Sequence, residues 1–481
     1  ELRENHAGYA GAAAEALGES GVERGAEDMA ELYESTDDYE IKEGILRGFT
    51  HIPDPVIVPA LSETLRLDVD NNPIALHSYS CDILGDVALD HPDAIDEDAR
   101  EAIVLGLYQS NNKGQSTGKE CGLAVQKVGE PMVDLLIETY EGENEEVNEL
   151  IRKFNQPPRY EFPANYVKIA AAGALGALRA EEAVEPMLDD LRSEKAANPQ
   201  MGKHHATQWR TKEGQATSET INALGNIGDE EAVDTLSGIV EKRYIEDEWS
   251  DFVDALVELQ LRQNAADALV RIGDRGATDM LINMAENGSV AELERRAKAL
   301  EKADEDPMDD EERYQLNWRM AKAFANLAGA NDASKLQGLI DRTQQEGLKE
   351  KYEQYLPKVE KGGECLGKSG DEAQAECFGD LLSDDEASSE VYQKAAFELS
   401  RLSADAAGPV VEEHLGHDNL SAREIVTFAA YRVPTEGMVD KVDEVLKDEE
   451  NRSSDEYKMD HRRLKHLKAW LQNHNEADAE E

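Results

Sequence analysis

Six side chains between Lys203 and Lys212 have the types and spacing that best fit a binding role in this chain. They are Lys203, His204, His205, Trp209, Arg210 and Lys212, which place cationic groups around one tryptophan. Trp and Arg are enriched among the residues that carry binding energy at protein interfaces. The segment therefore predicts a contact loop for an acidic or peptide partner. The alternative is a solvated loop whose tryptophan folds back onto a neighbouring hairpin.

Two histidines near the C-terminus, His414 and His417, are weak candidates for metal ligands. They lie three residues apart near an expected helix end, with Glu413 and Asp418 beside them. The chain contains no CxxC or HExxH motif of the kind that holds zinc. Ordinary helix-end histidines are the alternative, and the sequence indicates no metal and no cofactor. It contains no strand-rich region either, and we predict no catalytic residues.

Four cysteines fall into two pairs. Cys365 and Cys377 bracket a turn that contains glycine and serine, and we expect a disulfide there that staples two helices. Two free thiols are the alternative for this pair. Cys81 and Cys121 occupy similar places in successive sequence units, and we expect them to be buried and unpaired. The expected disulfide favours an oxidising, extracytoplasmic compartment.

The composition is strongly acidic. The chain has 103 Asp and Glu against 50 Lys and Arg, which gives a net charge of -53. Such a surface repels phosphate backbones, so we predict no nucleic-acid partner unless the surface has a local exception. A surface adapted to high salt is one interpretation, and attraction of a basic partner or of divalent cations is another. The acids from Asp304 to Asp310 are a candidate for loose calcium binding, with a solvated turn as the alternative.

The elements that must position these residues form a repeat. The segment "NALGNIGDEEAVDTLS" from Asn222 recurs as "GALGALRAEEAVEPML" from Gly173 and "DALVRIGDRGATDMLI" from Asp267, with six looser copies elsewhere. The gap between the copies that contain Phe324 and Leu399 is the longest, and it predicts a degenerate unit around Cys365 and Cys377. The equivalent apolar positions, called register residues below, are Leu46, Leu84, Val125, Leu175, Leu224, Leu269, Phe324, Leu399 and Ala430.

Each unit reads as a helical hairpin. Ile221, Leu224 and Ile227 follow a helical spacing, and Gly228 is suited to end that helix in the left-handed conformation. Asp229 is then placed to cap the next helix, whose first turn favours the acids that follow. One such hairpin cannot bury its apolar stripe alone, so stacked neighbours must cover it.

The turn pattern A-L-G-x-I-G-D-x-x-A-V-x-x-L resembles the HEAT repeat, and most closely the short bacterial variety of the bilin-lyase type. This resemblance implies an all-α fold, a right-handed α-solenoid (superhelix) of about nine or ten HEAT-like helical hairpins. We expect capping helices in residues 1–40 and repeats in 41–450. The repeats carry insertions near 193–216 and 285–317 and the cysteine-bracketed turn 365–377. A closing helix and an acidic tail follow in 451–481.

This fold favours a non-enzymatic scaffold for protein–protein interaction, whose partner the sequence does not identify. A lyase-like enzyme or chaperone for a chromophore protein is the alternative that the resemblance implies. Calcium-dependent adhesion or assembly is a third possibility.

No apolar run reaches the roughly 18 residues that a membrane span needs. Because the chain begins at Glu1, we expect that a leader, with or without a lipid anchor, preceded it. We predict a periplasmic or cell-envelope location in a salt-adapted bacterium, with a cytoplasmic one as the alternative.

Overall fold

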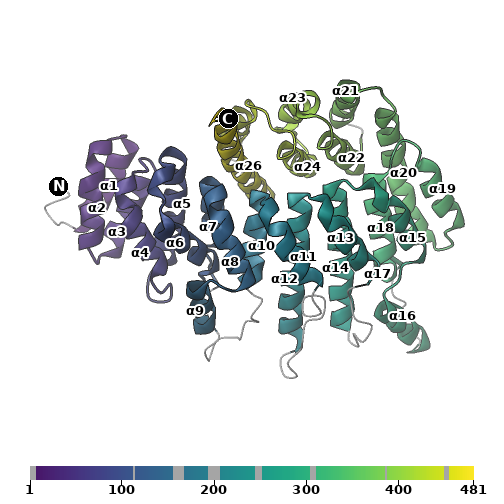
Figure 1. The fold of residues 1–481 in the computed structure, drawn as a ribbon, viewed down its shortest axis with the longest axis horizontal. Helices are drawn as coiled ribbons and strands as arrows, with labels where there is room; N and C mark the ends of the chain where they lie inside the picture. The colour runs from purple at the N-terminus through teal and green to yellow at the C-terminus, as the bar shows by residue number, and fades with distance from the viewer. Residues whose placement is uncertain are drawn as a thin grey trace. The chain divides into compact units, whose positions relative to one another are not determined.

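The computed structural model describes residues 7–111, 114–154, 167–192, 206–243, 252–303, 310–384, 387–448 and 454–480. Over these residues the chain is an all-α solenoid of stacked HEAT-like hairpins, as the turn pattern predicts (Figure 1). The chain divides into two compact units. Unit 1 comprises residues 1–180 and 472–481, and unit 2 comprises residues 181–471.

Unit 1 has two layers of helices. The first helices of its hairpins pack against one another in one row, and the second helices form the other row. The first row is α1 (Ala7–Glu19), α3 (Tyr39–Phe49), α5 (Ile74–Asp90), α7 (Gly118–Val128) and α10 (Val167–Leu178). The second row is α2 (Ala26–Ser35), α4 (Val58–Arg66), α6 (Glu97–Tyr108) and α8 (Val133–Glu141), and α9 (Glu145–Phe154) packs on α6.

Unit 2 repeats this arrangement. Its first helices pack consecutively as α12 (Ala206–Ile227), α14 (Phe252–Ile272), α18 (Gln315–Leu327), α20 (Glu346–Leu366), α22 (Ser389–Leu399) and α24 (Leu420–Ala430). The other layer holds α11 (Val184–Arg192), α13 (Val233–Val240), α15 (Thr278–Asn287), α19 (Ala333–Arg342), α21 (Asp371–Leu382), α23 (Ala404–His414) and α25 (Met438–Asp448). The last helix of the chain is α26 (Asp455–Glu480).

The core follows the predicted register. All nine register residues have an exposed fraction of 0%, from Leu46 in α3 to Ala430 in α24. Each lies on the first helix of its hairpin, where neighbouring first helices cover it. Burying a leucine or phenylalanine side chain contributes about 1.5 to 3 kcal/mol. The repeated apolar position is therefore a main source of the stacking energy.

The turn between paired helices is built as the sequence predicts. Gly228 has φ +86°, and the Asp229 carboxylate accepts a hydrogen bond from the Glu231 N–H at 2.8 Å. Gly273 and Asp274 repeat this turn one hairpin later, with φ +91° and a bond of 2.9 Å to the Gly276 N–H. A short 3-10 turn from Glu230 to Ala232 precedes α13, so the cap acts on this turn rather than on the α-helix itself.

The degenerate unit predicted between Phe324 and Leu399 is the hairpin α20–α21. The Cys365–Cys377 disulfide joins its two helices, which confirms the expected staple. The insertion expected near 285–317 contains α16 (Ala291–Ala303) and α17 (Asp310–Arg313). The acidic stretch 304–309 lies outside the described residues, so the calcium candidate there is untested. Among the described helices, none combines the length and apolarity of a membrane span.

Cys81 and Cys121 are buried as predicted, but the prediction that they are unpaired was wrong, because they form a disulfide. Cys81 lies on α5 and Cys121 on α7, and their Cα atoms are 4.8 Å apart. Equivalent positions of successive repeats face each other wherever first helices pack side by side. Two cysteines one repeat apart therefore meet in space, although 40 residues separate them in the chain.

Replacing Cys81 and Cys121 together by serine should lower the free energy of unfolding by about 4 kcal/mol in the chain-entropy model of disulfide stabilisation. The matching replacement of Cys365 and Cys377 closes a shorter loop, of separation 12 rather than 40, and should cost about 3 kcal/mol. Urea unfolding followed by circular dichroism measures both losses. Alkylation of the denatured wild type should add mass only after reduction, and any labelling before reduction would contradict the pairing.

Candidate functional site

In unit 2 a polar or cationic side chain follows each register residue two positions later. Two residues correspond to about 200° of helical rotation, so these side chains point away from the register residue. They come from successive first helices or from the turn directly after them. The five residues are Asn226, Arg271, Asn326, Arg401 and Arg432.

Arg271 links α14 to α12. Its Nη1 donates to the Asn222 carbonyl oxygen and to Asn226 Oδ1, both at 3.1 Å. Arg432, which follows α24, donates from Nη2 to the Asn226 carbonyl oxygen at 3.3 Å. Asn226 thus accepts hydrogen bonds from two arginines, one of which lies 206 residues later in the chain.

Two further cations bond to carbonyl oxygens at the ends of first helices. Arg401 Nη2 donates to the Val270 carbonyl oxygen at 2.8 Å, near the end of α14. Lys394 Nζ donates to the carbonyl oxygens of Asn326 and Ala328, at 2.9 and 2.7 Å, at the end of α18. The last carbonyls of a helix have no partner within the helix and carry partial negative charge. Cations from α22 and from the turns after α22 and α24 therefore cap the helices α12, α14 and α18.

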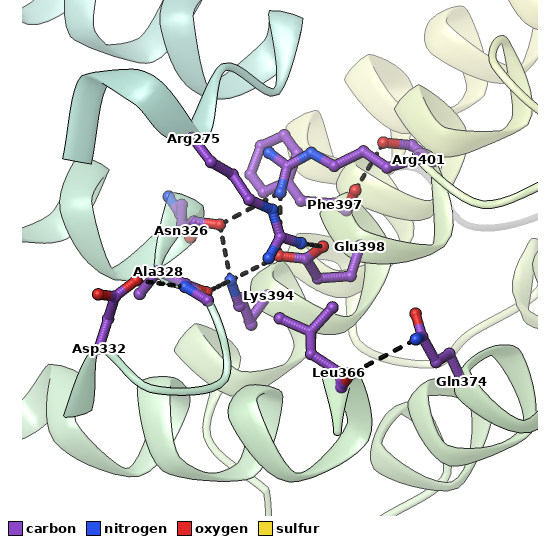
Figure 2. A network of polar contacts seen from close by, with 12 residues as sticks. Arg275, Asn326, Ala328, Asp332, Leu366, Gln374, Lys394, Phe397, Glu398 and Arg401 are labelled. Atoms are coloured by element: carbon purple, nitrogen blue, oxygen red, sulfur yellow. Dashed lines mark hydrogen bonds and ion pairs between the residues drawn. The ribbon is translucent and has the colours of Figure 1, made fainter. Parts of the chain in front are cut away.

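One buried carboxylate holds these cations together (Figure 2). Glu398 is 1% exposed, and its oxygens lie 2.6 Å from Lys394 Nζ, 2.6 Å from Arg275 Nη2 and 3.0 Å from Arg401 Nη1. Burial alone would raise the pKa of Glu398, but the three cations hold that pKa below its usual value. Burial lowers the pKa of Lys394 to about 8, although the negative charge of Glu398 acts to raise it. The carboxylate is therefore ionised, and it offsets part of the cost of burying the lysine.

A second cluster lies on the neighbouring helices. Lys358 on α20 is fully buried, and its Nζ lies 2.6 Å from Glu390 Oε2. The other Glu390 oxygen lies 2.9 Å from Lys322 Nζ, which comes from α18. Burial lowers the pKa of Lys358 to about 8, while Glu390 acts in the opposite direction.

We call this face of the first helices of unit 2 the ladder. Its cations outnumber its carboxylates, although acids dominate the chain as a whole. Arg275, in the turn after α14, and Asp332, in the turn after α18, add one charge of each sign to the face. The ladder cations are Arg271, Arg319, Lys322, Lys358, Lys394, Arg401 and Arg432, and the ladder carboxylates are Glu219, Asp267, Glu390 and Glu398.

The ladder opens to solvent at Asp267. This carboxylate is exposed, yet the packed protein around it removes enough water to raise its pKa. Arg271, Arg319, Lys322 and Lys358 act against that shift through their charge. Solvent therefore reaches a place on α14 around which four cations converge.

The contact segment predicted from the sequence is only partly described. Lys203, His204 and His205 lie outside the described residues. Trp209, Arg210 and Lys212 belong to α12, which begins at Ala206, and their side chains also lie outside the described part. The second half of the expected loop is therefore helical and lengthens α12 at its start.

Both candidate metal-ligand histidines use their ring nitrogens within the protein. His414 lies 3.0 Å from Ser383 Oγ through Nε2 and 2.8 Å from the Val410 carbonyl oxygen through Nδ1. His417 Nε2 lies 2.9 Å from the Leu382 carbonyl oxygen, and its Nδ1 accepts from the Asn419 N–H at 2.9 Å. No group of three or more potential metal ligands occurs among the described residues.

Two segments match catalytic motifs in spacing alone. Residues 114–118 (GQSTG) fit the spacing of a nucleophile elbow, and residues 362–369 (GGECLGKS) fit that of a P-loop. Both motifs require a turn between a strand and a helix. Gly362 to Leu366 instead form the last turn of α20, where Cys365 is in a disulfide. Ser116 Oγ accepts from the Gly118 N–H, which begins α7. The local structure therefore supports neither activity.

No protein-family model and no curated protein matches the chain. Among solved structures, a Kap95:Nup1 complex is similar at a TM-score of 0.40 and 12% identity, over 90% of this chain and 60% of that chain. An importin beta crystallised with ammonium sulfate is similar at a TM-score of 0.39 and 10% identity, over 93% and 57%. This chain thus spans about 60% of the length of these proteins. At these TM-scores the likeness does not bear on function.

Replacing Glu398 by Gln should destabilise the protein by about 3 to 5 kcal/mol, because it leaves buried cations without a counter-ion. The matched control is Glu286→Gln, which breaks the exposed pair between Glu286 and Arg342 at 2.7 Å and should cost less than about 1 kcal/mol. Urea unfolding measures both changes. Equal losses in the two variants would show that the buried network does not hold unit 2 together.

Replacing Gly228 by Ala should cost more than replacing Gly142 by Ala. Both residues have positive φ, +86° and +82°, so each alanine costs about 1 to 2 kcal/mol in backbone strain. A Cβ at residue 228 would lie only 1.7 Å from Arg432 Nη2, whereas a Cβ at residue 142 meets nothing within 4 Å. The extra cost should disappear when Arg432 is also replaced by Ala. Persistence of that cost in the double variant would place Arg432 elsewhere.

Proposed function

We propose that this chain is a non-enzymatic scaffold for protein–protein interaction. The observation that carries the proposal is the ladder, a charged face that runs over successive first helices of a HEAT-like stack. Stacked repeats present regularly spaced side chains over several helices, which suits the binding of an extended partner segment. The lysines and carboxylates of the two buried clusters are bonded to each other and to main-chain oxygens. Such bonding is typical of structural rather than catalytic charges.

The two disulfides support an extracytoplasmic location, because disulfides persist in oxidising compartments. The large excess of Asp and Glu over Lys and Arg supports a salt-rich environment. Alkylation of free thiols in intact cells before lysis tests this proposal. All four cysteines should remain unlabelled, and labelling of any of them in intact cells would favour the cytoplasm.

A lyase-like enzyme or chaperone for a chromophore protein is the second candidate. Only the turn motif supports it, through the three central copies that resemble the bilin-lyase type of repeat. A tetrapyrrole carried by the purified protein would absorb visible light. Colourless protein that also fails to change the spectrum of an added bilin would leave the scaffold as the better proposal.

The scaffold itself is tested by cross-linking the protein in native cell envelopes and identifying the linked peptides. A scaffold should give a reproducible partner in a fixed stoichiometry, and the purified pair should co-elute in size-exclusion chromatography. The double replacement Trp209→Ala and Arg210→Ala tests whether the start of α12 contacts the partner. If it does, the variant should no longer capture the partner. Failure to form any complex of fixed stoichiometry would contradict the scaffold function.

A further inference from the structure

Three arginines of the ladder differ from most other arginines of the described chain. Arg271, Arg319 and Arg432 make no ion pair with any carboxylate among the described residues, although Asp and Glu are twice as numerous as Lys and Arg in the sequence. Arg66 in unit 1 shows the contrasting case. It makes ion pairs with Asp98, Glu101 and Glu146 at 3.1 to 3.4 Å. Arg24, Arg100, Arg192 and Arg462 also make no ion pair among the described residues, but the ladder is a face on which three such arginines lie together.

The same face has hydrogen-bond donors without acceptors. The Nε atoms of Arg319, Arg401 and Arg432 are buried and have no partner in the described part of the chain. Leaving a buried donor unsatisfied costs free energy that a structural network would avoid. Arg271, Arg319 and Arg432 are each only partly buried as whole residues, so this face is not sealed from solvent.

We propose that the ladder binds an acidic peptide segment of a protein partner, whose carboxylates pair with Arg271, Arg319 and Arg432. This inference rests on the proposed scaffold function and names the chemistry of its partner. Arginine and carboxylate form paired, charge-assisted hydrogen bonds of defined geometry. The negative charge of the rest of the chain does not prevent this contact, because salt screens charges beyond about 8 Å at physiological ionic strength.

The arrangement favours separate carboxylates over a run of phosphates. Glu219, Asp267 and Glu390 act on the cations of the ladder through their negative charge, so a polyanion with a charge at every step would meet repulsion there. A peptide places its acidic side chains at intervals and turns other side chains toward these positions. The ladder therefore fits an acidic peptide better than a nucleic acid.

The test uses the full-length protein and a fluorescent peptide of eight glutamates, with anisotropy measured in 150 mM salt. Wild type should bind this probe, and the variant with Arg319→Gln and Arg432→Gln should bind it on the order of tenfold more weakly. Neither replacement removes an ion pair of the described residues, but Arg432→Gln removes the hydrogen bond to the Asn226 carbonyl oxygen, so circular dichroism must first show that the variant is folded. Asp267→Asn should bind more tightly than wild type, an effect that misfolding does not produce.

The matched control is the variant with Arg152→Gln and Arg342→Gln, which removes the same charge from exposed pairs with Glu145 and Glu286. It should bind the probe as wild type does. Equal weakening in this control, an Asp267→Asn variant that does not bind more tightly, or no binding by wild type would each overturn the proposal. A single-stranded oligonucleotide of eight phosphates that binds more tightly than the peptide would assign the ladder to nucleic acid instead.

The experiment separates this inference from the scaffold proposal. If a cross-linked envelope partner binds the ladder variant as well as it binds wild type, the scaffold stands and the inference about the ladder fails. If the peptide results hold but no complex of fixed stoichiometry exists, the scaffold function fails and the acidic-ligand site remains.

Discussion

Unit 2 depends on how the carbonyl oxygens at the ends of α12, α14 and α18 find donors. A helix leaves these oxygens without partners, and packing against neighbours hides them from water. Arg432, Arg401 and Lys394 supply the donors from hairpins much later in the chain, up to 206 residues away. The other features follow from this requirement. Glu398 balances the buried cations, and the Arg432 guanidinium lies where a side chain at Gly228 would begin.

The sequence predicts the local part of this structure well. The register residues, the turn at Gly228 and Asp229, and the degenerate hairpin at Cys365 follow from spacing within one or two helices. The Cys81–Cys121 disulfide was missed because it requires knowledge of which helices are neighbours. Its signal was present, since the two cysteines are about one repeat apart at similar positions. A repeat period converts such sequence spacing into spatial contact.

The ladder was missed for a related reason. A search for basic residues along the chain finds clusters within a few positions, such as the segment from Lys203 to Lys212. The ladder takes one or a few residues from each of several helices, so no short window contains it. The detectable signal was the position two residues after each register residue, which is polar or cationic throughout unit 2. Net charge conceals this pattern because it averages over the whole chain.

The two kinds of charge on the ladder have different physical roles. Lys358, Lys394 and Glu398 are buried beyond the reach of solvent, and their charges are balanced by close partners, so they hold helices together. Arg271, Arg319 and Arg432 are only partly buried and make no close ion pair in the described chain, although Asp267 and Glu219 act on Arg271 through their charge. Cations that served stability alone would gain by pairing with one of the many acids of this protein. Arg271 and Arg432 already bond to main-chain oxygens of α12, and their lack of a close ion pair favours a second role, in which another molecule supplies the carboxylates.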